Sequence, residues 1–166
     1  MAASPRYSVP DDDICGYLLG VWKQTLEWRE FGPSFEHIRT SNSLVTVHDC
    51  PDAAVEPGTR LLDWRSRTEL DDVKLAFSMQ FFPGPRETVV EWDNKGRICR
   101  GDFNSAAAVL SLPSRDDDGL VSNATYRILD ANTMTLCIAE VDKQNTLIQY
   151  GHMCRLPESS GRPKDS

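Results

Sequence analysis

The most regular feature of the chain is an alternation of apolar and polar residues that begins at Val21. Two interleaved sets follow one another: Trp22, Gln24, Leu26 and Trp28, and between them Lys23, Thr25, Glu27 and Arg29. Successive side chains of a β-strand point to opposite faces of a sheet. A period of two therefore predicts a strand that is buried on one side.

A short helix is predicted immediately before this strand. Pro10 is followed by three aspartates at positions 11–13. Carboxylates at a helix start cap free amide groups and favour the positive end of the helix dipole. The helix would run to about Leu19, and Gly20 would end it. Its core-facing residues would be Ile14, Tyr17 and Leu18.

Nine further segments carry strand patterns: Ser43–Asp49, Leu61–Glu69, Val73–Phe82, Glu87–Asp93, Arg97–Phe103, Ala106–Leu112, Leu120–Leu129, Thr133–Val141 and Thr146–Leu156. With the first segment they make about ten strands joined by short turns. One helical turn is expected at residues 34–38. So many short strands with so little helix predict an all-β fold, either a sandwich or a barrel.

The length and composition fit one domain. The chain has 166 residues, of which 40% are hydrophobic, and this is enough to bury a core. We expect a flexible arm at residues 1–9, the domain at residues 10–156, and a disordered tail at residues 157–166. The tail is polar and rich in Pro, Gly and Ser.

The charge argues against two classes of partner. The formal net charge is -7, and lysine and arginine form no cluster along the chain. Nucleic acids and anionic membranes attract basic patches, so we expect neither as a partner. The charge leaves the oligomeric state open.

The sequence further predicts a cytoplasmic protein without a metal or cofactor. No apolar run has the length of a signal peptide or a membrane span. In a reducing compartment the five cysteines would stay free: Cys15, Cys50, Cys99, Cys137 and Cys154. No CxxC pair suggests zinc, and no phosphate loop, dinucleotide fingerprint or nucleophile elbow occurs.

The opening of the first strand, Tyr17-Leu18-Leu19-Gly20-Val21-Trp22-Lys23, resembles that of the calycins, which include lipocalins and fatty-acid-binding proteins. In those barrels a short helix leads into Gly-x-Trp, and the tryptophan plugs the closed end. An arginine on the last strand lies over that tryptophan in a cation–π contact. Arg155, near the end of the last predicted strand, fits this role.

The resemblance implies an intracellular, antiparallel, up-and-down lipocalin-like β-barrel of about eight to ten strands. Chromophore lyases of phycobiliproteins share this barrel and also open with Gly-x-Trp. Their arginine-rich penultimate strand is not evident in this sequence. The barrel type thus follows from the resemblance, whereas the kind of activity does not.

The function implied by the resemblance is the binding of a small hydrophobic molecule inside the barrel. The large inward side chains would either fill a core or line that cavity. The expected ligand-binding residues are Trp28, Trp64, Phe77, Met79, Trp92, Arg100 and Tyr126. The choice of Arg100 assumes a three-residue loop at residues 94–96. That loop would turn Arg100 inward, where fatty-acid-binding proteins hold a carboxylate.

The alternative function is a cofactor-independent isomerase or cyclase that acts on an apolar substrate in the same cavity. Orientation of a bound substrate can contribute about 7–11 kcal/mol without any recognisable catalytic motif. His152 and Glu140 are the candidate acid–base pair, because burial and mutual charge tune such groups. A three-residue loop within residues 142–145 would turn both inward. A loop of two or four residues would place them on opposite faces, and the sequence leaves this choice open.

Overall fold

The computed structural model of the chain describes residues 9, 13–33, 35–50, 55–68, 74–84, 88–94, 96–115 and 118–158. Most of the predicted N-terminal arm and most of the predicted tail lie outside these residues. The same holds for Pro10 and for the first two aspartates of the predicted helix start.

Within the described residues the chain forms one short helix, α1 (Ile14–Leu18), followed by ten strands. The strands are β1 (Gly20–Gly32), β2 (Phe35–Asp49), β3 (Arg60–Thr68), β4 (Lys74–Pro83), β5 (Thr88–Asn94), β6 (Arg97–Asn104), β7 (Val109–Arg115), β8 (Val121–Asp130), β9 (Thr133–Val141) and β10 (Thr146–Arg155). Asp13 caps α1 by accepting a hydrogen bond from the amide of Gly16 at 2.7 Å, as expected of an aspartate at a helix start.

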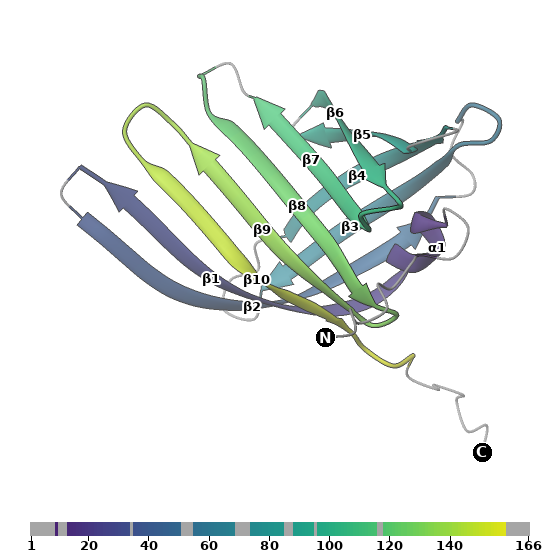
Figure 1. The fold of residues 1–166 in the computed structure, drawn as a ribbon, viewed down its shortest axis with the longest axis horizontal. Helices are drawn as coiled ribbons and strands as arrows, with labels where there is room; N and C mark the ends of the chain where they lie inside the picture. The colour runs from purple at the N-terminus through teal and green to yellow at the C-terminus, as the bar shows by residue number, and fades with distance from the viewer. Residues whose placement is uncertain are drawn as a thin grey trace, which may run out of the picture.

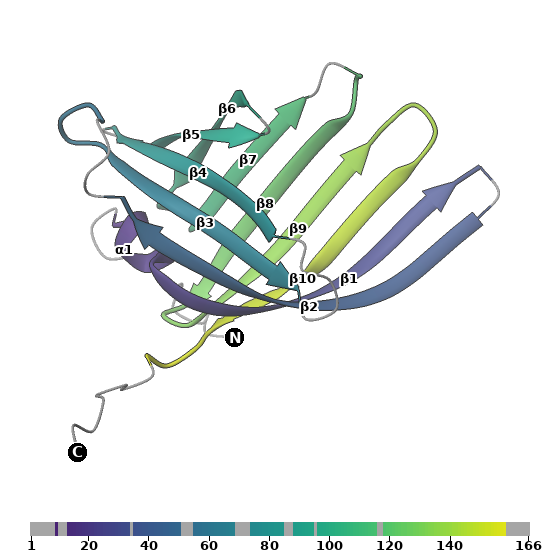
Figure 2. The ribbon, with the colours of Figure 1, turned by 180° about the vertical axis from the view of Figure 1, so that it is seen from behind.

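The ten strands form one closed barrel in which strands consecutive in sequence lie side by side. β1 pairs with β2 on one side and with β10 on the other, and this second pairing closes the barrel. Figures 1 and 2 show the same meander from the front and from behind. The structure therefore confirms the predicted antiparallel lipocalin-like barrel with a short N-terminal helix.

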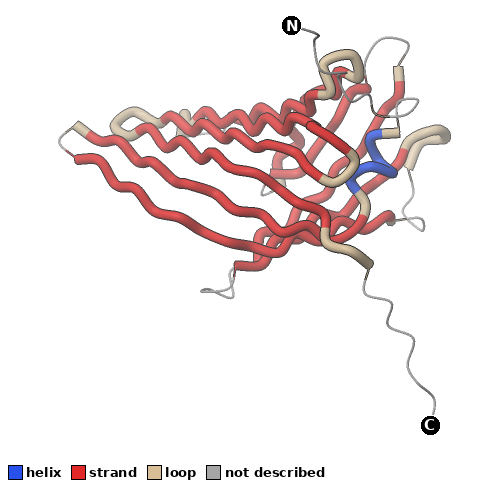
Figure 3. The backbone as a smooth tube through the Cα atoms, turned by 60° about the horizontal axis from the view of Figure 1, so that its bottom comes forward, coloured by secondary structure: helices blue, strands red, loops and turns tan. Residues whose placement is uncertain are grey.

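The two ends of the barrel differ. Helix α1 lies against the closed end, and the β1–β2 and β9–β10 hairpins project at the opposite, open end (Figure 1). β1 and β2 have 13 and 15 residues, whereas β5 and β7 have 7 each. The long hairpin strands run on to the tip of the open end (Figure 3). The first and last hairpins therefore build the wall of the open end.

The start of β2 corrects one expectation. The sequence predicts a helical turn at residues 34–38, but Phe35–Ile38 belong to β2. Gly32 pairs with Phe35 across a two-residue connection, and pairing continues along the whole of β1. An isolated helical turn is unfavourable because it fixes several residues for one hydrogen bond. A long neighbouring strand offers a full ladder of hydrogen bonds instead.

Trp22 and Arg155 hold the closed end together. Trp22 is fully buried, and its Nε1 donates a hydrogen bond to the carbonyl of Leu18 at 2.9 Å. The guanidinium carbon of Arg155 lies 4.2 Å from the Trp22 ring centroid. The same guanidinium donates to the carbonyls of Leu19, at 2.5 Å, and of Tyr17. One arginine on the last strand thus binds both the buried tryptophan and the end of the helix.

Gly20 shows why the motif contains a glycine. Its φ is +118°, which side-chain-bearing residues rarely adopt, and an added Cβ would lie 3.2 Å from Nη1 of Arg155. A side chain at this position would be strained and would crowd the guanidinium. Gly20, Trp22 and the distant Arg155 therefore form one structural unit.

Arg155→Met should lower the free energy of unfolding by about 2–4 kcal/mol, because the cation–π contact and the hydrogen bonds to helix carbonyls are lost. Urea unfolding followed by tryptophan fluorescence measures this loss. Arg155→Lys keeps the charge without the planar fork, so it should lose less. Arg29→Met is the control, because Arg29 and its partner Glu27 are both exposed. Equal effects of the two methionine variants would contradict the role given to Arg155.

Candidate functional site

The inner face of β1, β10, β9 and β8 carries three rows of paired residues that climb from the core to the open end. The floor row consists of Leu26, Gly151, Leu136 and Tyr126. The middle row consists of Trp28, Gln149, Ile138 and Ala124. The rim row consists of Glu30, Leu147, Glu140 and Ser122. On β2, Ser41, Arg39 and His37 continue the floor, middle and rim rows.

Burial decreases from the floor row to the rim row. On β1, β10, β9 and β8 the floor row is buried except for Gly151, and the middle row is half-buried except for Gln149. The rim row is half-buried throughout these four strands. The interior thus changes from a packed apolar floor to a polar rim within four residues of each strand. We call the inner surface formed by the middle and rim rows the cup.

Four aromatic rings cross the barrel at the bottom of the cup. Trp92 on β5 contacts Phe77 on β4, and Phe77 stacks on Trp64 on β3, with ring centroids 5.6 and 5.7 Å apart. Trp64 in turn meets Tyr126 on β8 edge-on at 5.6 Å. β3 and β8 lie on opposite sides of the ring of strands. These four residues, the aromatic bridge, therefore close the interior beneath the middle row.

The two ends of the aromatic bridge differ in burial. Trp64 and Tyr126 are buried, whereas Phe77 and Trp92 are only partly buried and pack against the core. The Nε1 of Trp92 is buried and has no hydrogen-bond acceptor within the described ranges. The bridge thus belongs to the core at β3 and β8 and forms the edge of the core at β4 and β5.

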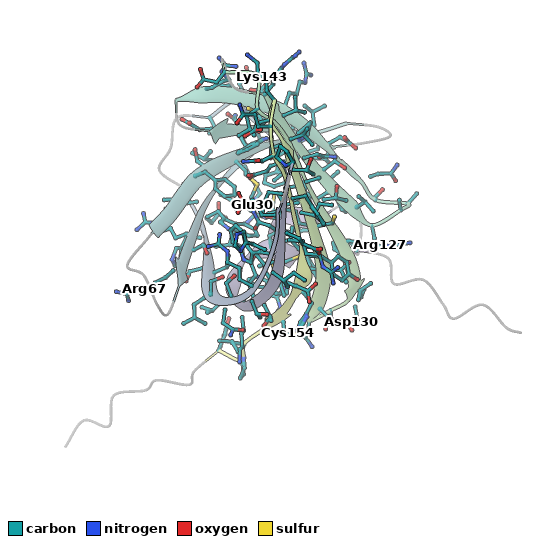
Figure 4. The ribbon with its side chains drawn as sticks, turned by 90° about the vertical axis from the view of Figure 1, so that its left-hand side faces the viewer. Glu30, Arg67, Arg127, Asp130, Lys143 and Cys154 are labelled. Atoms are coloured by element: carbon teal, nitrogen blue, oxygen red, sulfur yellow. The ribbon has the colours of Figure 1, made fainter. Side chains whose placement is uncertain are left out.

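Trp28 is held in the wall of the cup by two contacts. Its Nε1 donates to Oγ of Ser41 at 2.6 Å, and the guanidinium carbon of Arg39 lies 4.5 Å from its ring centroid. A pocket of about 240 Å³ opens here, lined by Trp28, Glu30, His37, Ile38, Arg39 and Leu147. Figure 4 looks at the molecule from this end and shows Glu30 near the centre of the view, with Arg127 at the periphery.

Six of the predicted ligand-binding residues point into the barrel: Trp28, Trp64, Phe77, Met79, Trp92 and Tyr126. Trp28 belongs to the wall of the cup, and four of the others make the aromatic bridge. Met79 is fully buried in the core, between its paired neighbours Leu62 and Trp92. The alternation of the sequence therefore finds the apolar part of the interior.

Arg100 lies on the outer face, contrary to the prediction. Asn94 pairs with Arg97, so two residues rather than three form the turn. Trp92 is therefore paired with Cys99, which faces inward and is buried, while Arg100 is exposed. Arg39 on β2 lines the pocket in its place.

His152 and Glu140 lie on opposite faces of the sheet. Thr146 pairs with Val141, so the connection has four residues. Glu140 belongs to the rim row, whereas His152 is exposed on the outer face between Thr25 and Thr135. The structure does not bring these two side chains together as an acid–base pair.

Comparison with solved structures places this architecture. The S-type phycobiliprotein lyase CPES from Guillardia theta matches with a TM-score of 0.67, over 93% of this chain and 96% of that chain. The fold is that of a lipocalin-like barrel. The two sequences are 10% identical, so the likeness shows the fold alone. The sequence matches no protein-family model and no curated protein.

Four polar residues of this lipocalin-like barrel reach the cup without belonging to any motif: Glu30, His37, Arg39 and Gln149. The signal that could have found them is strand register. A period of two that continues past Trp28 places Glu30 inward. A two-residue turn after Gly32 then pairs Glu30 with His37 and Trp28 with Arg39, so both β2 residues also face inward. The four-residue connection after Val141 places Gln149 inward in the same way. The missing information was the length of two turns.

Three further observations concern metal ligands, helices and cysteines. In the part of the chain that the structure describes, no three His, Cys, Asp or Glu side chains converge as a metal site requires. No helix in the same ranges has the length and apolar character of a membrane span. All five cysteines are free.

Tyr126 contributes a neutral hydroxyl to the floor row. Burial raises the pKa of its phenol well above the usual range, because the apolar surroundings disfavour the phenolate. The side chain therefore stays protonated at physiological pH.

The folded state favours the protonated phenol. Its contribution to the free energy of unfolding is therefore fully present below about pH 10 and is lost as the pH rises further. Tyr126→Phe should therefore lose less stability between about pH 10 and pH 12 than the wild type. Urea unfolding at a series of pH values measures the difference. Tyr150→Phe, on the exposed outer face, is the control. If Tyr126→Phe and the wild type lose stability equally, the buried phenol does not titrate with unfolding.

Proposed function

We propose that this barrel binds one small, largely apolar molecule in the cup, between the aromatic bridge and the polar rim. The observation that carries the proposal is a set of partly buried apolar side chains directly above the core: Trp28, Phe77, Trp92, Ala124 and Ile138. They come from five strands and pack against the same core, and Trp28 also lines the pocket. Concave, mostly apolar sites with a few polar groups are typical of small-molecule binding.

The proposed ligand has an apolar body and a polar end. The apolar body would lie against Trp28 and the aromatic bridge, and the polar end would reach Glu30, His37 and Arg39 at the pocket. The fold likeness to a phycobiliprotein lyase supports a pigment-like molecule as a candidate. Binding inside a reducing, cytoplasmic compartment remains a prediction of the sequence.

A larger side chain at Ala124 should block the cup. Ala124 faces inward in the middle row, so the larger side chain of Ala124→Phe would occupy the place of the ligand. Binding of an apolar probe such as phenanthrene should weaken at least tenfold, which corresponds to a loss of about 1.4 kcal/mol of binding free energy. Quenching of tryptophan fluorescence measures the affinity. Native mass spectrometry of the protein from its own source would show whether a small molecule is retained.

Ala139→Phe is the matched control for this substitution. Ala139 follows Ile138 on β9, so its side chain points to the outer face. It should leave the affinity unchanged. If both phenylalanine variants bind phenanthrene like the wild type, the cup is not the binding site.

Catalysis on the same ligand is the second candidate function, and one observation favours it. Glu30 and His37 occupy directly paired positions on the inner face, and both line the pocket. A carboxylate and an imidazole at the mouth of an apolar cavity supply an acid and a base. The reaction would be a cofactor-independent isomerisation or cyclisation.

Incubation of the retained molecule with the protein tests this alternative. Conversion to a product of equal mass should fall about 100-fold or more in Glu30→Gln, within the usual range for loss of a general acid or base, while binding persists. Chromatography with mass detection follows the conversion. Glu27→Gln on the outer face is the control. Conversion that survives Glu30→Gln undiminished rules out this glutamate as the acid or base.

A further inference from the structure

Gln149 is the one middle-row residue on β1, β10, β9 and β8 that is buried. Its exposed fraction is 6%, and its side chain points inward between Trp28 on β1 and Ile138 on β9. Its amide makes no hydrogen bond with any other residue in the described ranges. Neither amide atom belongs to the buried side-chain atoms that lack a partner in the described ranges, so both stay accessible at the inner face, where they offer two donors and an acceptor.

Neighbouring polar groups on the inner face differ from Gln149 because they are paired within the protein. Nε1 of Trp28 donates to Ser41, and Nε2 of Gln24 donates to Oγ of Ser43 at 3.3 Å. One face of the Trp28 ring is also covered by the Arg39 guanidinium. At the level of the middle row, Trp28 and Ile138 therefore offer apolar surface beside an unpaired amide.

We infer that Gln149 determines the specificity of the cup by binding a neutral ligand group that presents a donor and an acceptor side by side, as an amide or lactam does. The inference rests on the proposed function. Gln149 can donate through Nε2 and accept through Oε1, so it matches such a group with two hydrogen bonds. A carboxylate lacks the donor, and the apolar neighbours disfavour its charge. The ligand class is thus a planar, largely apolar molecule with one neutral amide-like group.

Two probes of the same shape test this assignment: phenanthridinone, a planar tricyclic lactam, and phenanthrene, the corresponding hydrocarbon. Gln149→Leu should weaken phenanthridinone about tenfold, the loss expected for one to two net hydrogen bonds. Phenanthrene should bind as tightly as before or more tightly. Tryptophan-fluorescence titration measures both affinities.

Gln24→Leu is the matched control. It removes an inward-facing amide that already has a partner in Ser43, so it should not change the ratio of the two affinities. Thermal unfolding supplies an independent measurement. Gln149→Leu should unfold at the same temperature as the wild type or higher, because the substitution removes no hydrogen bond within the described ranges and adds an apolar side chain beside Trp28 and Ile138. Gln149→Met repeats the test with an unbranched side chain.

Several outcomes would overturn the inference. One is a Gln149→Leu variant that binds both probes as the wild type does, or weakens both equally. Another is a clear loss of thermal stability in both Gln149 variants, because the amide would then support the fold. If the wild type binds phenanthrene but its preference between the two probes does not depend on Gln149, the proposed function stands. Only the specificity assigned to Gln149 is then overturned. A wild type that binds neither probe overturns the proposed function as well.

Discussion

The contact between Arg155 and Trp22 joins the two strands at which the barrel closes. It joins the last strand to the first, and every later pair between β1 and β10 follows from this register. Because Arg155 lies opposite Trp22, Gln149 lies opposite Trp28. A shift of one residue would turn each inward side chain of β10 to the solvent. The structural unit at the closed end thus determines which residues meet in the cup, far along the same strands.

The fold was largely readable from the sequence because its main signals are local. The alternation around Trp22 predicts a half-buried strand, and the resemblance of Gly20-Val21-Trp22 to calycins separates barrel from sandwich. The helical turn expected at residues 34–38 failed for the opposite reason. Phe35–Ile38 form a strand because β1 continues beside them, and that partner is set by tertiary structure rather than by local propensity.

The candidate site was predictable in its apolar part and not in its polar part. Trp28, Phe77 and Trp92 belong to strands whose inward faces are marked by several large side chains. Arg100 depended on a turn length, and a single residue in a turn reverses the face of the following strand. Turn lengths are weakly encoded when polar residues and glycine fit loops of two, three or four residues equally well.

The middle row is where the barrel departs from the packing that stability alone would favour. On β1 and β9 the buried Leu26 and Leu136 of the floor row are followed in the middle row by the large apolar Trp28 and Ile138, whereas β8 and β10 carry Ala124 and Gln149 at this level. A fully buried leucine contributes about 1.5–3 kcal/mol relative to an exposed one, so a leucine at position 149 would extend the core at little cost in volume. Natural sequences commonly retain such unfavourable residues where a site needs them. A small side chain and an amide without a partner in the described ranges thus lie on either side of Ile138 on the inner face of the cup. Together, the small side chain of Ala124 and the amide of Gln149 fit a site for a ligand with an apolar body and one neutral polar group.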